Sequence, residues 1–327
     1  MFEDFNIASR LILEEARSRG INTSFVYKNF AKMQFGNHIE YLHAQISSKT
    51  TAVARRICAD KNITKTFLRS AGISVADGKA FTPDQLDEAK QYISGQNHPF
   101  VIKPATGGMG KDVFLDINNE DQLEIAWKKM DPKTELIVVE RQFSGEEYRL
   151  MVTREKFLAA TKRVPANVVG DGVNTIAQLV EQKNSDPRRS DDTHDPIVKI
   201  RLDDTALFHL EQSGYSPDFI PEKSQTVYIR KNSNISTGGD SYDYTDKIHD
   251  TVKEIALRTI KAIPGLAWAG IDFMSQDTAT EQKPDDYIIV EVNSSPGIDM
   301  HHFPYSGQPR DVARDLIDLL FPETASN

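Results

Sequence analysis

Apolar residues recur with helical spacing in the first seventy positions of the chain. Residues 7–20 place an apolar side chain every three or four positions and end in a glycine, which predicts an amphipathic helix. The same pattern predicts helices at 50–59 and 61–71, and a short strand-like run lies at 23–27. Because this opening part is too short for a complete nucleotide-binding fold, we interpret residues 1–60 as a shortened N-terminal α/β lead-in domain.

From residue 81 onward, strands and helices alternate. The predicted elements, in order, are a helix at 83–94, a strand at 100–103, a glycine-rich loop, a strand at 112–117, a helix at 120–130 and a strand at 136–140. This order predicts a small α+β unit, which we place at residues 61–143. Residues 144–327 form the second unit, in which strands alternate with polar loops and helices up to an amphipathic helix at 312–320. The predicted fold class is therefore α+β.

Two apolar strands are predicted near the C-terminus, at 266–274 and 287–293, and both carry polar residues. The polar segment between them lets the chain return, so that the two strands can pair. Because side chains alternate along a strand, Glu291 and Asn293 should project to one side, while Val290 and Val292 enter the core.

Pairing of these strands would bring Asp272 close to Glu291 and Asn293. Mg²⁺ prefers oxygen ligands and is usually held by a few carboxylates together with substrate phosphates. Surface solvation is the alternative for any acidic residue, but an unpaired charge at a buried strand is costly. These three residues are our candidate magnesium ligands.

The glycine-rich loop reads KPATGGMGK and spans residues 103–111. Its glycines let the backbone approach a ligand and point N–H groups at it. No Ser or Thr follows the final lysine, and the glycine spacing does not match a dinucleotide-binding fingerprint. A plain β-hairpin turn is the alternative, but Lys103 and Lys111, which flank the loop, favour a polyphosphate ligand.

Composition narrows the function classes. The chain is 39% hydrophobic and 27% charged, which is typical of a globular protein. Its net charge of −9 argues against general nucleic-acid binding. We expect no membrane span, because no apolar run approaches about 18 residues. The single cysteine, Cys58, and an acidic N-terminus without signal-peptide character lead us to expect a cytoplasmic protein.

Together, these motifs resemble the ATP-grasp superfamily over about residues 61–322. The resemblance implies an ATP-grasp fold, in which two α+β subdomains clasp ATP. It also implies roles for the nucleotide-binding residues: phosphate contacts from Lys61 and Lys103; a phosphate-covering loop with Thr106, Gly107, Gly108 and Gly110; adenine contacts at the hinge from Glu140 and Phe143; and a ribose contact from Glu147. Asp272, Glu291 and Asn293 match the family's Mg²⁺ ligands, with two ions expected and Mn²⁺ as a substitute.

Two longer strings resemble a narrower group within the superfamily. RVPANVVGDG at 163–172 and RKNSNISTGGD at 230–240 are similar to the ATP-grasp half of bifunctional glutathione synthetase and to cyanophycin synthetase. The tail from Glu291 to Gly297 is nearer to cyanophycin synthetase and to D-alanine–D-alanine ligase. However, Gly270 stands where the latter has an arginine.

The resemblance implies an ADP-forming carboxylate–amine ligase that acts through an acyl phosphate. Arg163 and Arg230 are candidates for contacting the transferred phosphoryl group, and Asn232 and Asn234 for polarising the intermediate. The expected substrates are small amino acids or short peptides, foremost γ-glutamylcysteine and glycine, and the relatives suggest a homodimer. Three alternatives stay open: a cyanophycin-synthetase-like ligase, a phosphotransferase without an amine acceptor, and a non-catalytic nucleotide-binding module.

Overall fold

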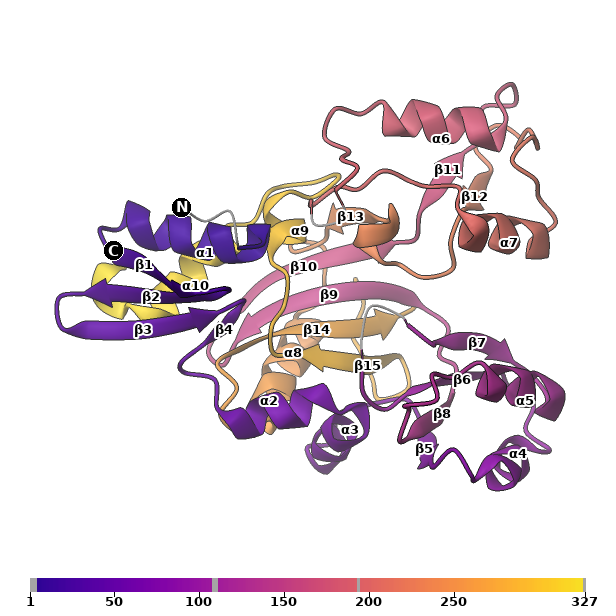
Figure 1. Cartoon of the computed structure of the whole chain (residues 1–327), viewed down its shortest axis with the longest axis horizontal. Helices are drawn as coiled ribbons and strands as arrows, with labels where there is room; N and C mark the ends of the chain where they lie inside the picture. Colours follow the sequence, from indigo (N-terminus) through magenta and orange to yellow (C-terminus); the bar gives the residue numbers. More distant parts are fainter. Residues whose placement is uncertain (1–4, 108–110, 193–194, 326–327) are drawn as a thin grey trace.

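The computed structural model describes residues 5–107, 111–192 and 195–325. A five-stranded antiparallel sheet lies at its centre (Figure 1), which confirms the predicted α+β class. The strands of this large sheet, in spatial order, are β13 (Asp240–Asp243), β10 (Phe157–Val164), β9 (Glu146–Thr153), β14 (Trp268–Ser275) and β15 (Tyr287–Asn293).

A smaller antiparallel sheet forms the predicted unit around the glycine-rich loop. Its strands, in spatial order, are β5 (Gly78–Phe81), β8 (Ile137–Arg141), β6 (Phe100–Pro104) and β7 (Phe114–Ile117). Helices α4 (Leu86–Ile93) and α5 (Glu120–Lys128) supply apolar residues to the core that this small sheet builds for itself.

The N-terminal part forms a third antiparallel sheet at one end of the molecule (Figure 1). It contains β1 (Asn22–Tyr27), β2 (Phe30–Phe35), β3 (His38–His43) and β4 (Ile46–Ser47), of which only the first was predicted. This sheet and helix α1 (Ile7–Ser18) share one hydrophobic core with the C-terminal helix α10 (Val312–Leu320) and with residues of the large sheet. The predicted domain boundaries stay predictions, but core packing crosses residue 60.

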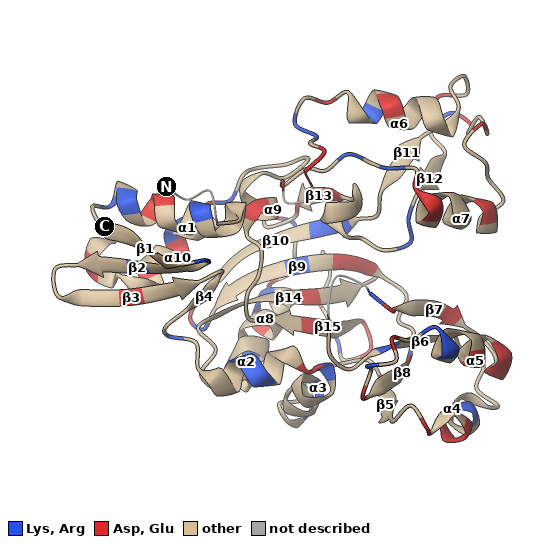
Figure 2. Ribbon diagram, viewed as in Figure 1, with Lys and Arg blue, Asp and Glu red and all other residues tan. Residues whose placement is uncertain are grey.

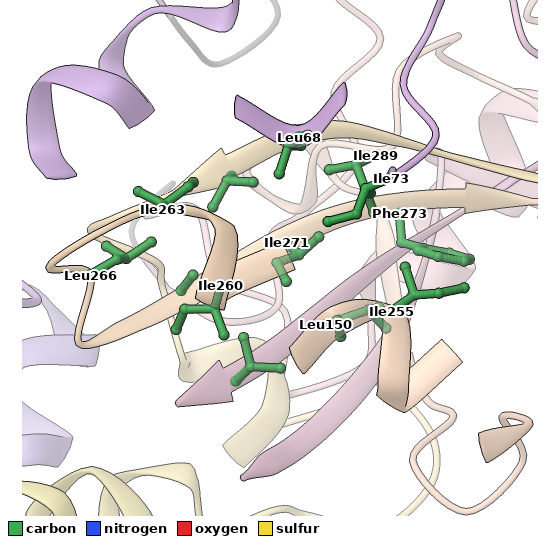
Figure 3. Packing of buried hydrophobic residues seen from close by; sticks show 14 of the residues in the cluster. Leu68, Ile73, Leu150, Ile255, Ile260, Ile263, Leu266, Ile271, Phe273 and Ile289 are labelled. Carbon is green, nitrogen blue, oxygen red and sulfur yellow. The ribbon is translucent and has the colours of Figure 1, made fainter. Parts of the chain in front are cut away.

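Helices cover the apolar face of the large sheet. They are α2 (Ala52–Ala59), α3 (Lys61–Ser70) and α8 (Asp250–Ala262). Figure 3 shows Leu68 and Ile73 from the N-terminal half packed among the sheet residues Ile271, Phe273 and Ile289. None of the helices in the described part of the chain is long and apolar enough to span a bilayer.

A small module is inserted between β10 and β13 and has its own core. It contains β11 (Asn167–Val169), α6 (Ile176–Asn184), α7 (Asp204–Gln212), β12 (Thr226–Tyr228) and the 3₁₀ turn η1 (Ile235–Thr237). An ion pair between the half-buried Lys183 Nζ and the buried Asp240 Oδ2, 2.5 Å long, connects the module to the large sheet. The short helix α9 (Asp299–His302) and the 3₁₀ turn η2 (Pro322–Thr324) complete the chain.

Leu68→Ala should test the packing of α3 on the large sheet. Leu68 is 1% exposed in this core, so its truncation should lower the free energy of unfolding by about 2–5 kcal/mol. Phe67, its neighbour on the same helix, is 36% exposed, and Phe67→Ala should change the free energy of unfolding by only about 0.5 kcal/mol. Urea denaturation of the two variants compares them directly. Equal losses would contradict the described packing.

Candidate active site

A cavity of about 840 Å³ lies where the large sheet, the small sheet and the inserted module meet. Every predicted site residue that the structure describes lines this cavity: Lys61, Lys103, Thr106, Gly107, Glu140, Phe143, Glu147, Arg163, Arg230, Asn232, Asn234, Asp272, Glu291 and Asn293. Gly108 and Gly110 lie outside the described residues. The convergence of these residues is observed, whereas their individual roles stay predictions.

Lys61 is placed at the cavity by the start of helix α3. The Asp60 side chain caps this helix by accepting hydrogen bonds from the backbone N–H groups of Asn62 and Ile63, at 3.0 and 3.2 Å. The Lys61 ammonium then donates to the Gly107 carbonyl at 2.7 Å and lies 3.7 Å from Glu291 Oε1. One side chain therefore connects the helix, the glycine-rich loop and β15.

Glu140 is a buried carboxylate that pairs with two lysines. Its Oε2 pairs with Lys65 Nζ and its Oε1 with Lys103 Nζ. Burial alone would raise the pKa of Glu140, but the positive charges of Lys103 and Lys65 outweigh it and lower that pKa. Lys65 was not singled out in the sequence, although its spacing of four residues from Lys61 places both on one face of the helix.

Asp272, in the large sheet, also pairs with two cationic side chains. Arg149 Nε donates to its Oδ1 at 2.6 Å, and Arg163 Nη2 lies 3.0 Å from its Oδ2. Burial alone would raise the pKa of Asp272, but the positive charges of Arg149 and Arg163 outweigh this effect and lower that pKa, with Arg149 contributing most. Figure 2 shows basic positions on β9 and β10 and acidic positions on β14 and β15, and β9 is the strand that pairs with β14.

Glu147, the predicted ribose contact, belongs to the same group of charged side chains as Asp272 and Arg163. Its carboxylate pairs with Arg163 Nη2 and accepts from the Ser233 hydroxyl. Arg149 was not predicted from the sequence, although it lies two residues after Glu147 on β9 and therefore points to the same face of the sheet. At Gly270, an added Cβ would lie 3.0 Å from Arg149 Cδ and 2.6 Å from Pro296 Cβ. This glycine thus leaves room for the Arg149 side chain.

The pairing of β14 with β15 confirms that Asp272 lies beside Glu291, but the prediction for Val290 was wrong. Asp272 is paired with Glu291 and the next residue, Phe273, is paired with Ile289, so Val290 is the extra residue of a β-bulge. Because the bulge interrupts the alternation of faces, Val290 lines the cavity instead of entering the core. Val292 is buried in the core as predicted.

The donor set at β14 and β15 fits a magnesium ion that is shared with a ligand. Asn293 Nδ2 is buried and has no hydrogen-bond partner among the described residues, and rotation of the amide by about 180° would place its oxygen at the same position. Asp272 keeps acceptor capacity beyond its two arginines, since a carboxylate has about four lone-pair sites. In the described part of the chain, no three His, Cys, Asp or Glu side chains gather to hold a metal ion by themselves. Ligand oxygens would have to complete the coordination.

The inserted module contributes the remaining wall of the cavity. Arg230 Nη2 pairs with Asp203 Oδ2 at 2.5 Å, and its buried Nε finds no partner in the described part of the chain. Lys231 forms an ion pair with Asp116 on β7, so the module and the small sheet touch at the cavity. Gln142 at the hinge donates to Asp116 Oδ1 at 2.8 Å and holds that carboxylate in place.

Comparison with known proteins assigns the fold. The family described as phosphoribosylglycinamide synthetase, ATP-grasp (A) domain, matches residues 59–164. The crystal structure of a bifunctional glutathione synthetase from Pasteurella multocida aligns with a TM-score of 0.75 and 34% identity, covering 98% of this chain and 44% of that one. The predicted ATP-grasp fold is confirmed.

Two groups of curated proteins are about equally similar to the chain. It is 36% identical over 321 residues to cyanophycin synthetase from Trichormus variabilis, which covers 98% of this chain and 35% of the relative. It is also 36% identical over 330 residues to the glutathione biosynthesis bifunctional protein GshAB from Clostridium perfringens, covering 98% and 42%. The chain thus spans less than half the length of these relatives, and the predicted resemblance to both is confirmed.

Binding of a divalent ion should require a nucleotide. Arg149 and Arg163 carry positive charges beside Asp272 and therefore repel a metal ion that approaches this carboxylate. The phosphate oxygens of a bound nucleotide would offset this repulsion, because they supply negative charge and further metal ligands. Titration of Mn²⁺ followed by electron paramagnetic resonance should therefore detect at least tenfold weaker binding without ADP than with it. Asp272→Asn should weaken the ADP-dependent binding. Equally tight Mn²⁺ binding without ADP would contradict this site.

Proposed function

The chain belongs to the ATP-grasp superfamily, and from this premise we propose that it is an ATP- and Mg²⁺-dependent carboxylate–amine ligase that releases ADP. The observation that carries the proposal is one cavity in which Lys61, Lys103 and Arg163 face the oxygen donors of β14 and β15. Such a combination of cations and metal ligands suits a triphosphate and its metal ion better than an uncharged substrate.

The reaction explains why the site needs charge more than a nucleophile. A free carboxylate does not acylate an amine, because its leaving group would be oxide. Transfer of the γ-phosphoryl group from ATP to the carboxylate forms an acyl phosphate, and this step spreads negative charge over the transferring oxygens. We assign Lys61 and Lys103 to stabilising that charge, and a bound Mg²⁺ would supply further charge neutralisation on the phosphates.

The second step is attack of the amine on the acyl phosphate. The amine nitrogen forms a bond to the acyl carbon, phosphate leaves with the electron pair of the broken C–O bond, and the nitrogen loses a proton. We assign Arg163 and Arg230 to the developing oxyanion and phosphate, and Asn232 and Asn234 to polarisation of the acyl group. The glycine-rich loop would exclude water, which otherwise hydrolyses the acyl phosphate.

For the substrates, we propose a small-peptide ligase of the glutathione synthetase type, with γ-glutamylcysteine as carboxylate and glycine as amine. The similarity to the bifunctional glutathione proteins supports this choice. The equal identity to cyanophycin synthetase gives the same degree of support to the alternative, a cyanophycin-synthetase-like ligase that extends a peptide. A screen of amine donors separates them, since only the first accepts glycine on a γ-glutamyl dipeptide.

ADP release in the presence of Mg-ATP should depend on both a carboxylate and an amine. Each pair that gives turnover is checked by mass spectrometry for a new amide. Lys103→Met and Glu291→Ala should lower kcat/KM by at least about 100-fold, because the first removes a cation from the phosphates and the second removes a proposed ligand of the metal ion that would neutralise them. Lys128→Met is the matched control, since this lysine side chain is 70% exposed on α5 and pairs only with Glu124 in the described structure.

The outcomes separate the alternatives. ADP release without an amine, with a stable phosphorylated product, would identify a phosphotransferase. Binding of ATP without turnover for any pair would identify a nucleotide-binding module. Either result would contradict the ligase proposal.

A further inference from the structure

One buried cation beside the cavity has no role in the proposed reaction. Lys65 lies on α3, one helical turn after Lys61, and is only 4% exposed. The cavity lining includes Glu140 and Lys103 but not Lys65, which therefore lies behind the carboxylate. Lysine is rarely buried so deeply unless it is paired, so the environment of this side chain needs a physical reason.

The contacts of Lys65 form a chain that ends at the cavity. Its ammonium pairs with Glu140 Oε2, and the other oxygen of the same carboxylate pairs with Lys103. The Lys65 backbone is held firmly, because Leu68 anchors α3 in the core and Asp60 caps its start. The position of Lys103 at the cavity wall is thus set from behind, through Glu140, by Lys65.

The charges of this group do not balance. Two ammonium groups face one carboxylate, which leaves one positive charge in excess at a place where Glu140 and Lys103 are 4% and 5% exposed. Arg69, on the same helix as Lys65, adds further repulsion instead of compensation. An anion in the cavity beside Lys103 would supply the missing negative charge.

We infer that Lys65 is a positioning residue of the nucleotide site, which fixes Glu140 and Lys103 and keeps the group one positive charge in excess for a phosphate of the bound nucleotide to compensate. This inference rests on the proposed function, since it takes the nucleotide as the ligand. No motif points to this residue, and its role follows from the contacts and the charge count together.

A consequence is that nucleotide binding should be linked to proton uptake. Burial lowers the pKa of Lys65 to about 8 in the free protein, with Glu140 opposing this effect and Lys103 and Arg69 adding to it. A nearby phosphate favours the charged ammonium and raises that pKa. Below pH 8 the lysine is charged in both states, so affinity should not depend on its protonation. Above pH 8 binding should take up a proton, and affinity should fall as pH rises.

The test is calorimetric titration of the full chain with MgADP between pH 7 and 9, in buffers with different heats of ionisation. Phosphate groups do not titrate in the upper part of this range, because their second pKa is about 6. The wild-type chain should take up a fraction of a proton above pH 8. If binding raises the pKa of Lys65 by about one unit, the full effect across the transition is about tenfold in affinity.

Two variants separate positioning from a plain structural role. Lys65→Met should bind MgADP about tenfold more weakly at pH 7, without proton uptake above pH 8, because the excess charge is gone. Lys65→Arg should keep the affinity of the wild type but lose the pH dependence, because a guanidinium stays charged over this range. Thermal unfolding of each variant verifies that it is folded.

Lys183→Met provides the matched control. Lys183 is another lysine whose pKa is lowered by burial and which pairs with a buried carboxylate, but it lies outside the cavity lining. This variant should keep the wild-type pH dependence of MgADP binding. The inference is overturned if the wild type takes up no proton above pH 8, or if Lys65→Met keeps its uptake. Absence of MgADP binding by the wild type would contradict the proposed function itself, and the inference with it.

Discussion

The cavity depends on one constraint, which is that a buried carboxylate must be neutralised. Glu140 in the small sheet and Asp272 in the large sheet each meet this constraint with two cationic side chains. These shared pairs fix the orientation of Lys103 and Arg163 toward the cavity without any ligand. The same arrangement leaves both walls rich in positive charge, and a polyanion can then bind between them without large rearrangement of the side chains.

The architecture around the cavity explains how these charges stay in place. The large sheet carries Arg149, Arg163 and Asp272 on three adjacent strands, while α2, α3 and α8 seal its apolar face. Helix α3 joins the two walls, because it packs in the core of the large sheet and pairs Lys65 with the small sheet. A substitution in α3 would therefore affect both folding and the site.

Sequence patterns predicted the elements with strong periodicity and missed those whose signal is not local. Strand β15 and helix α10 have the predicted bounds, because apolar residues dominate the first and the second is strongly amphipathic. Strands β2 and β3 were missed, since each buries few apolar residues and β3 buries Glu40 between the exposed Ile39 and Tyr41. The bulge at Val290 depends on pairing across strands, which residue types do not reveal. Motifs located the cavity lining, but the pairing of Lys65 and Arg149 with buried carboxylates appears only in three dimensions.

In the proposed function, the cavity binds the phosphates of a nucleotide between its two walls. A crystal structure of the chain with ADP and Mg²⁺ tests this most directly. We predict phosphate oxygens within hydrogen-bonding reach of both Lys61 and Lys103, and the metal ion at Asp272, Glu291 and Asn293. A nucleotide bound outside the cavity, or with its phosphates turned away from both lysines, would overturn the proposed phosphate site.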